Sequence, residues 1–346
     1  MKIAHLVHLT ESVPPGKYGG TERVVFHLTE ELVQLGHDVT LFASGDSLTS
    51  AKLVPMCERA LKHTPFINRD AIMTRMLERI WNMSHQFDII HSHMDFVGFP
   101  LARRSVVPTI TTVHGHLSAP ELADVYREFR EIPLVSISYS QRTAFPSNSW
   151  KANVYHGLPI DLYRFHPKGK GYLAFLGRIS PEKAPDVAIR IAKRLGLPLY
   201  MAAKVDPVDR QYFDAQIAPL LDDPLIHFIG EITDSEKGEF LGHACAVLCP
   251  YRPEPFGLVL IEALACGTPI VTYRHGSFPE IIDHGSTGFL CVDEEGMVQA
   301  VRQIHEIDRR HCRRHFERHF TSARMVKNYV QLYEQVLTET AMKRAA

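Results

Sequence analysis

The feature that most constrains the fold of this chain is a regular alternation of short apolar runs with longer segments of helical periodicity. Ile3–Leu9, Asp38–Ser44 and Thr109–His114 are short and largely apolar, as buried strands are. Residues 21–36 carry apolar side chains at helical spacing, begin at a threonine that can cap a helix, and end at a glycine. Strands that alternate with helices in this way predict an α/β fold with a doubly wound parallel sheet.

The alternation pauses in a link containing proline and glycine at about residues 158–171, and it restarts with the apolar run Tyr172–Arg178. A chain of 346 residues is long enough for two domains. We therefore expect two Rossmann-like domains, at residues 1–160 and 165–322, each with its own sheet. Two such sheets are expected to face a central cleft, which is the default place for an active site.

The composition excludes some classes of partner and indicates a compartment. The 38 basic and 39 acidic residues give a formal net charge of −1, so no overall field attracts nucleic acid. No run of 18 apolar residues is present that would span a membrane. The six cysteines include no CxxC pair, which favours reduced thiols in a cytoplasmic protein.

The stretch 252–267 concentrates the chemistry of the second domain. The proline after Glu254 keeps that residue in a loop, and the helix that follows begins near Gly257 and carries Glu262 about one turn in. The N–H groups of residues 256–259 at the start of this helix suit a phosphate group. Carboxylates beside a phosphate site suit a ligand that also carries hydroxyls, as sugars do. The alternative is a surface loop followed by an ordinary helix glutamate.

Two cations are expected at the same edge of this sheet. Arg178 ends the run Tyr172–Arg178, and Lys183 follows at the start of a helix. The carboxyl ends of strands are the ligand edge of a doubly wound sheet. Two fixed cations and a helix N-terminus can stabilise a departing diphosphate without a metal ion. The alternative is that both side chains are merely solvated.

The first domain carries weaker signals. Gly19 and Gly20 lie in the loop after the first strand, where glycines let the backbone approach a ligand or simply form a turn. His114 closes a later strand and is a candidate hydrogen-bonding group for the same ligand edge. Its alternative role is that of a core histidine with satisfied hydrogen bonds.

A metal site is the main alternative chemistry. His91, His93 and Asp95 form an HxHxD pattern at a strand end, as in some dinuclear metallohydrolases. Those sites need a further histidine at the next position, where this chain has Phe96. With 20 histidines in the chain, such pairs arise often by chance. We expect no metal here and keep a metallohydrolase as the alternative function.

A basic segment near the C-terminus raises the question of membrane contact. A basic amphipathic helix can lie on anionic lipid. The acidic residues within this segment favour an ordinary solvated face instead, so contact with the inner face of a membrane is a minor option. The basic residues are Arg309, Arg310, Arg313, Arg314 and Arg318.

Taken together, these motifs resemble those of the retaining glycosyltransferases of family 4, also described as group 1, which have the two-domain GT-B fold. The similar segments run along most of the chain, and their combination is specific although each alone is not. The resemblance also implies that the last helix, within 323–346, crosses back onto the first domain. The segments are Tyr18–Glu22, Thr112–Gly115, Gly177–Lys183, the pair Glu254 and Glu262, and residues 276–290.

The resemblance implies a hexosyltransferase that uses a UDP- or GDP-sugar and retains the configuration of the transferred sugar, without a metal ion or cofactor. The acceptor would be a hydroxyl of a sugar, a lipid-linked compound or a small molecule. Arg178 and Lys183 would contact the diphosphate, and together with Glu254 and His114 they would act in catalysis. Glu254 would contact the transferred sugar, and Glu262 the ribose. His114 would contact the sugar near the reacting centre. The donor would also be contacted by Gly19, Gly20, Phe256, Gly257 and Leu258.

Two departures from the family pattern leave the sugar open. Ala184 stands where the family often has glycine, and His275 stands where a glycine often precedes Gly276. Both could reshape the donor pocket. Two further alternatives are a sugar-nucleotide epimerase with the GT-B fold, which has no acceptor, and a sugar-nucleotide binding module without catalysis.

Overall fold

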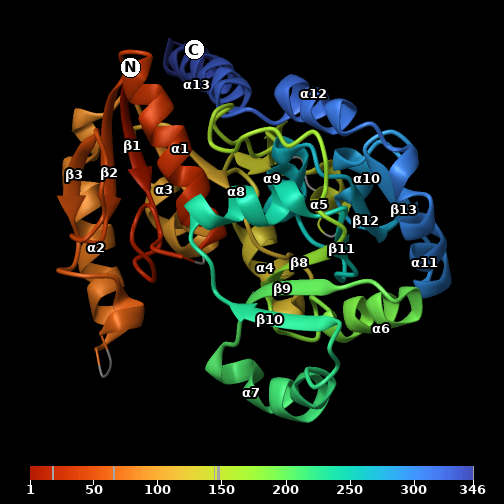
Figure 1. The fold of residues 1–346 in the computed structure, drawn as a ribbon. Helices are drawn as coiled ribbons and strands as arrows, with labels where there is room; N and C mark the ends of the chain where they lie inside the picture. Colours follow the sequence, from red (N-terminus) through yellow and green to blue (C-terminus); the bar gives the residue numbers. More distant parts are fainter. Residues whose placement is uncertain (18, 65–66, 144, 146–148, 346) are drawn as a thin grey trace. The chain divides into compact units, whose positions relative to one another are not determined.

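The computed structural model describes residues 1–346 except 18, 65–66, 144, 146–148 and 346 (Figure 1). The described chain forms two compact units. The first comprises Met1–Gly157 together with Ser322–Ala346, and the second comprises Leu158–Thr321. The boundary between them lies at 157/158, a few residues before the limits expected from the sequence.

The first unit is built on one seven-stranded sheet in the order β3-β2-β1-β4-β5-β6-β7, and every neighbouring pair is parallel. Its strands are β1 (Lys2–Leu6), β2 (Asp38–Ala43), β3 (Lys52–Pro55), β4 (Ile89–Ser92), β5 (Thr109–Thr112), β6 (Leu134–Ser136) and β7 (Trp150–Asn153). Its α-helices are α1 (Gly20–Gln34), α2 (Arg69–Met83), α3 (Phe99–Ala102), α4 (Pro120–Glu128), α5 (Tyr139–Thr143) and α13 (Ser322–Ala345).

Helix α1 forms where the apolar spacing predicts it, but it starts differently. Gly19 occupies the N-cap position and no side chain caps the first turn, so the expected capping role of Thr21 is wrong. The apolar face of α1, with Val24, Val25 and Leu28, is fully buried. It packs against β2 and α13, which places the C-terminal helix in the first unit.

The second unit has one six-stranded sheet in the order β10-β9-β8-β11-β12-β13, again all parallel. Its strands are β8 (Leu173–Arg178), β9 (Leu199–Lys204), β10 (Ile226–Gly230), β11 (Ala246–Cys249), β12 (Ile270–Tyr273) and β13 (Gly288–Cys291). Its α-helices are α6 (Pro185–Leu195), α7 (Arg210–Tyr212), α8 (Asp234–His243), α9 (Leu258–Cys266), α10 (Phe278–Ile281), α11 (Glu294–Arg302) and α12 (Arg309–His319).

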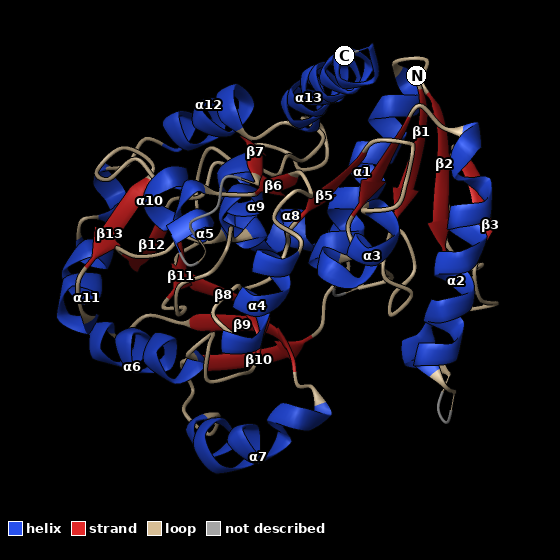
Figure 2. Cartoon of the chain, turned by 180° about the vertical axis from the view of Figure 1, so that it is seen from behind, coloured by secondary structure: helices blue, strands red, loops and turns tan. Residues whose placement is uncertain are grey.

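The strand orders explain why each unit has a ligand edge. In both sheets the first strand lies in the interior, the next strand is added on one side and the later strands on the other, which is the doubly wound order (Figure 2). The order therefore reverses between β1 and β4 in the first unit and between β8 and β11 in the second. Loops that follow the carboxyl ends of these strands diverge there, and ligands of doubly wound sheets bind in the resulting crevice.

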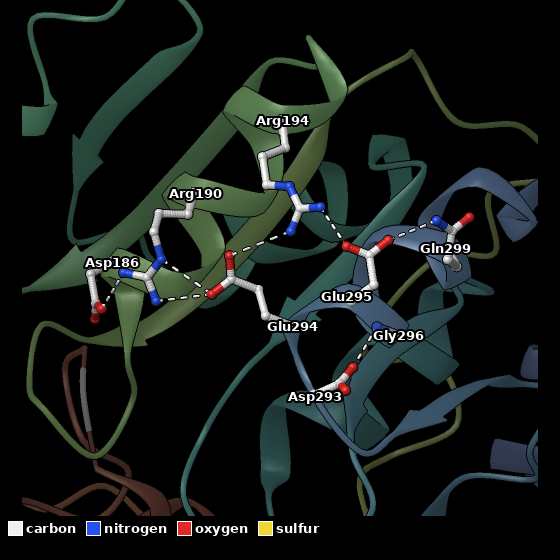
Figure 3. Close-up of polar contacts among 8 residues, drawn as sticks. All are labelled: Asp186, Arg190, Arg194, Asp293, Glu294, Glu295, Gly296 and Gln299. Atoms are coloured by element: carbon white, nitrogen blue, oxygen red, sulfur yellow. Dashed lines mark hydrogen bonds and ion pairs between the residues drawn. The ribbon is translucent and has the colours of Figure 1, made fainter.

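Helices α6 and α11 of the second unit are joined by a chain of surface ion pairs (Figure 3). Arg190 on α6 donates to Asp186 on the same helix at 2.8 Å and to Glu294 on α11 at 3.0 Å. Arg194, one turn later, pairs with Glu295. Each of these exposed pairs contributes little stability, and their effect is to fix the relative position of the two helices.

The helical pattern of residues 207–218 also predicts one helix in the sequence. The structure breaks it into a 3₁₀ turn, one α-helical turn, a π-helical stretch at Phe213–Ile217 and a further 3₁₀ turn. The edge strands β3 and β7 were not expected, because they are short and only partly buried and so lack a clear apolar pattern. Across the described residues, no helix combines the length and the apolar character needed to cross a bilayer.

Candidate functional site

The reversal point of the second sheet brings Lys183 and Glu254 together. Lys183 follows β8 and Glu254 follows β11, and these strands are neighbours. The Lys183 ammonium forms an ion pair with Glu254 Oε1, and the two side chains are 16% and 17% exposed. The same ammonium lies 4.3 Å from the centre of the Tyr251 ring, a favourable cation–π position. The two charges are therefore close together in a partly desolvated place.

The loop that carries Glu254 packs against Gly276 and accepts hydrogen bonds from Ser277. Gly276 has a φ of +56°, and a Cβ atom there would lie 3.0 Å from the backbone nitrogen of Glu254, so only glycine fits without a shift. The N–H of Ser277 donates to the carbonyl of Glu254 at 3.4 Å, and its hydroxyl donates to the carbonyl of Phe256. These contacts confirm that Glu254 lies in an ordered loop, outside the following helix.

Helix α9 presents its N-terminus next to this loop. It begins at Leu258, with Gly257 at the N-cap position in the left-handed region at φ +107°, and no side-chain cap bond is present there among the described residues. Glu262, one turn into α9, is only 2% exposed. Its carboxylate pairs with the Lys237 ammonium at 3.0 Å and accepts a hydrogen bond from the Tyr163 hydroxyl at 3.4 Å. The Glu262 carboxylate is thus a buried hydrogen-bond acceptor whose position is fixed by Lys237 and Tyr163.

Arg178 has a different environment from Lys183. Its guanidinium donates to Glu182 at 2.8 Å and lies 3.3 Å from the carboxylate of Asp209 and 3.8 Å from that of Asp206. Three carboxylates therefore balance its charge in the unliganded chain. An anionic ligand at Arg178 would compete with these groups.

In the first unit, His114 lies in a group of histidine rings. Its Nε2 lies 2.9 Å from His93 Nδ1, and its ring stacks on that of His156 with centroids 5.2 Å apart. Burial lowers the pKa of His114 to about 3, so the ring is neutral near pH 7. The buried Nδ1 has no hydrogen-bond partner among the described residues. A neutral imidazole of this kind can exchange a hydrogen bond with a sugar hydroxyl.

Gly19 and Gly20 lie at the start of α1, after the loop that follows β1. A Cβ atom at Gly19 would lie 2.7 Å from Pro15 Cβ and 3.1 Å from a Glu22 carboxylate oxygen, so a larger residue would displace this turn. Gly20 is the first residue of α1. Tyr18, which belongs to the same similar segment, lies outside the described residues.

The structure regroups the residues of the HxHxD pattern. The ring nitrogens that lie within 4.8 Å of one another belong to His5, His91 and His93, while Asp95 faces the backbone N–H of His114 at 3.4 Å. Both nitrogens of His91 are already bonded, one to the Thr112 hydroxyl and one to the Tyr333 hydroxyl, each at 2.7 Å. A metal ion on His91 would have to displace one of these bonds, so the geometry disfavours the metallohydrolase.

The basic segment is not one solvated face. Arg309 donates to the carbonyls of His166, Ala244 and Gly242 and to the Thr268 hydroxyl. Arg313 donates to backbone carbonyls at positions 160, 163 and 265. At least two of the five arginines therefore hold the second unit together, which weakens the case for a lipid-binding surface.

Comparison with known families decides the identity. A family profile described as glycosyl transferases group 1 matches residues 164–318, and one described as glycosyltransferase family 4 matches residues 18–167. The two matches meet and together cover most of the chain. The chain belongs to family 4 of the glycosyltransferases.

Relatives and solved structures agree with this assignment. Glycogen synthase of Mycobacterium tuberculosis H37Rv is 26% identical over 347 aligned positions, which cover 84% of this chain and 83% of that protein. Sucrose-phosphate synthase from Thermosynechococcus elongatus superposes with a TM-score of 0.81 at 18% identity, over 98% of this chain and 99% of that one. Anabaena HepE in complex with UDP and glucose superposes with a TM-score of 0.75 at 17% identity, over 96% of this chain and 99% of that one. The predicted GT-B fold is confirmed.

Some residues around Glu262 and Lys183 had no sequence signal. Lys237 and Tyr163 meet Glu262 from segments 25 and 99 residues away, and no motif links them. Ala184, where the family often has glycine, adopts the left-handed conformation at φ +47°. The position therefore favours glycine for a backbone reason, and alanine is accepted here at some cost in strain.

Proposed function

We propose that this glycosyltransferase moves a hexosyl group from a nucleotide-diphosphate sugar to an acceptor hydroxyl, with retention of configuration and without a metal ion. The observation that carries the proposal is the meeting of Lys183, Glu254 and the N-terminus of α9 at the reversal point of the second sheet, with Glu262 buried on the same helix. This set combines a fixed cation and helix N–H groups for phosphate with carboxylates for hydroxyls.

The roles follow from charge and position. The diphosphate binds to the Lys183 ammonium and to the backbone N–H groups of Phe256, Gly257 and Leu258. The Arg178 guanidinium also binds it, after giving up its contacts with the neighbouring carboxylates. Glu262 accepts from the ribose hydroxyls. Once the donor binds, Glu254 exchanges part of its contact with Lys183 for hydroxyls of the transferred sugar.

Transfer then needs one bond to form and one to break. The acceptor oxygen bonds to the anomeric carbon as the bond from that carbon to the diphosphate oxygen breaks, and the acceptor proton passes to the departing diphosphate. Same-face attack retains the configuration and needs no protein nucleophile. Lys183, Arg178 and the start of α9 stabilise the charge that develops on the diphosphate, as a metal ion does in other transferases. The absence of a DxD sequence supports metal-free transfer.

Family resemblance assigns three residues of the first unit to the same reaction. His114 would donate to or accept from the transferred sugar as a neutral imidazole, in keeping with its low pKa. Gly19 and Gly20 would let the backbone approach the donor. We propose these roles on the resemblance and on the local geometry of each residue.

The test compares two cations that lie close in sequence. Lys183→Ala should lower turnover by about 10²–10³-fold, the usual effect of removing one electrostatic contact from a transition state. Arg190→Ala is the matched control, because Arg190 pairs only with surface carboxylates among the contacts in Figure 3. It should keep turnover within about twofold of the parent. Equal activity of the two variants would contradict the site assignment.

The reaction itself is tested by product analysis. A panel of UDP-, GDP- and ADP-sugars is incubated with candidate acceptors and a chelator, and diphosphate release and the anomeric configuration of the product are followed. HepE, crystallised with UDP and glucose, makes UDP-glucose the first donor to test. The proposal is supported if the nucleoside diphosphate is released only when an acceptor is present and if the product has the same anomeric configuration as the donor. Conversion of the donor without an acceptor would indicate an epimerase instead.

A further inference from the structure

A second group of potential ligands lies in the second unit, on residues that the transfer reaction does not use. Glu239 and His243 are four residues apart on α8 and so lie on the same face of the helix. His166 approaches them from the loop before β8. One ligand atom from each of the three side chains lies within 4.8 Å of the others.

The separations match those of a tetrahedral metal site. His166 Nε2 lies 3.5 Å from Glu239 Oε1, and His243 Nδ1 lies 3.4 Å from Glu239 Oε2. Ligands about 2.0–2.2 Å from a tetrahedral zinc ion are about 3.3 Å apart, which is close to both of these separations, one to each oxygen of Glu239. The buried Nε2 of His166 has no hydrogen-bond partner among the described residues, although His166 is only 9% exposed. Leaving such a nitrogen unpaired is unfavourable unless a ligand reaches it.

The backbone and ring of His166 are fixed before any ligand arrives. Its N–H donates to the carbonyl of Cys266 at 3.0 Å, and its own carbonyl accepts from the Arg309 guanidinium at 2.7 Å. Its ring lies against Gly242, where a Cβ atom would be 2.1 Å from a ring carbon. A glycine at position 242 thus leaves room for the ring beside the last turn of α8. A histidine held in this way loses little freedom on binding a metal.

We propose that His166, Glu239 and His243 bind one divalent transition-metal ion of the zinc type, with a water molecule in the remaining position. Two imidazoles and a carboxylate are ligands that zinc accepts readily. The ion would join the C-terminal end of α8 to the loop before β8. Helix α8 also carries Lys237, nearer its N-terminus, and the loop carries Tyr163, so the metal would steady both partners of Glu262 without touching the reacting groups.

The test measures metal binding directly, on the full chain produced without a histidine tag and stripped with a chelator. Zn²⁺ is titrated in competition with a chromophoric chelator, and the thermal midpoint is recorded with and without the ion. We expect one ion per chain and a midpoint that rises by several degrees. Glu239→Gln and His243→Asn should each weaken binding at least tenfold and remove the rise. Both changes are at incompletely buried side chains, so the fold should persist.

A control histidine and a second metal make the result specific. His311 pairs with Asp308 at 3.9 Å on an exposed face and belongs to no group of three candidate ligands in the part of the chain that the structure describes, so His311→Gln should bind Zn²⁺ as the parent does. Co²⁺ should give an absorption spectrum without a thiolate charge-transfer band. The proposal is overturned if neither variant at 239 or 243 weakens binding, if His311→Gln weakens it as much, or if Co²⁺ shows thiolate ligation. Failure here leaves the transfer reaction untouched, because donor turnover is measured in chelator.

Discussion

The first unit should lose stability in mild acid because its core holds a cluster of neutral histidines. Burial is the main cause that lowers the pKa of every ring in the cluster, to about 3 for two of them, His5 and His114. Two of the rings bond neutral hydroxyls: His5 Nδ1 lies 2.8 Å from the Thr29 hydroxyl, and His91 bonds two hydroxyls. The other members of the cluster are His91, His93 and His156.

The direction and size follow from proton linkage. The unfolded chain binds a proton on each histidine below about pH 6.5, while the folded chain binds none until the pH is far lower. Stability is therefore complete above about pH 7.5 and is lost as the pH falls through 6.5. Each group approaches a slope of about 1.4 kcal/mol per pH unit only well below pH 6.5, so His5 and His114 together remove about 3 kcal/mol of stability between pH 7.5 and 5.5. For a unit of this size that loss lowers the thermal midpoint by roughly 5–10 °C across the whole range from pH 7.5 to 5.5.

The assay is thermal unfolding followed by circular dichroism between pH 7.5 and 5.5, in chelator so that metal binding does not contribute. His5→Gln removes one buried titrating group while keeping an amide that can bond Thr29, and it should reduce the pH slope by about one proton. His85→Gln, at an exposed position, is the control and should leave the slope unchanged. A midpoint that is constant over this range, or the same slope in His5→Gln as in the parent, would refute the reasoning.

Three further predictions concern the second unit. Lys237→Met leaves the buried Glu262 carboxylate without its cation and should destabilise the unit by about 3 kcal/mol in denaturant unfolding; a loss below about 1 kcal/mol would show that the pair is unimportant. Ala184→Gly relieves a left-handed alanine and should raise the thermal midpoint by about 1–3 °C after the entropy of glycine is counted, whereas a lower midpoint would contradict the strain. Glu182→Gln removes a competitor for Arg178 and should lower the KM for the donor by up to about fivefold, with kcat little changed; a raised KM would show that Glu182 helps binding.

The fold could be predicted from the sequence because its signals are local. Apolar runs such as 38–44 and 172–178, separated by segments of helical spacing, define parallel strands and crossover helices without any long-range information. The position of Glu254 in a loop followed from the proline after it. Because ligand edges in doubly wound sheets lie beyond strand ends, the contact between Lys183 and Glu254 was also within reach once both strands were predicted.

The rest depended on contacts that no local pattern encodes. Arg309 and Arg313 were expected on a solvated face, but they donate to backbone carbonyls of segments far away in the sequence. The pairing of Lys237 with Glu262 joins two helices by tertiary packing alone. His5, outside the HxHxD pattern, joins His91 and His93 because β1 and β4 are neighbours in register. Such groupings appear only when the sheet order is known.

The central claim is that the second unit binds the diphosphate of a sugar nucleotide through Lys183 without a metal ion. The most direct measurement is isothermal titration of UDP, GDP and ADP into the parent, Lys183→Ala and Arg190→Ala, all in chelator. We predict saturable binding of one nucleotide to the parent and to Arg190→Ala, and binding about 10–100-fold weaker in Lys183→Ala, as expected for a lost charged hydrogen bond. Binding that needs a divalent ion, or equal binding by all three proteins, would contradict the account.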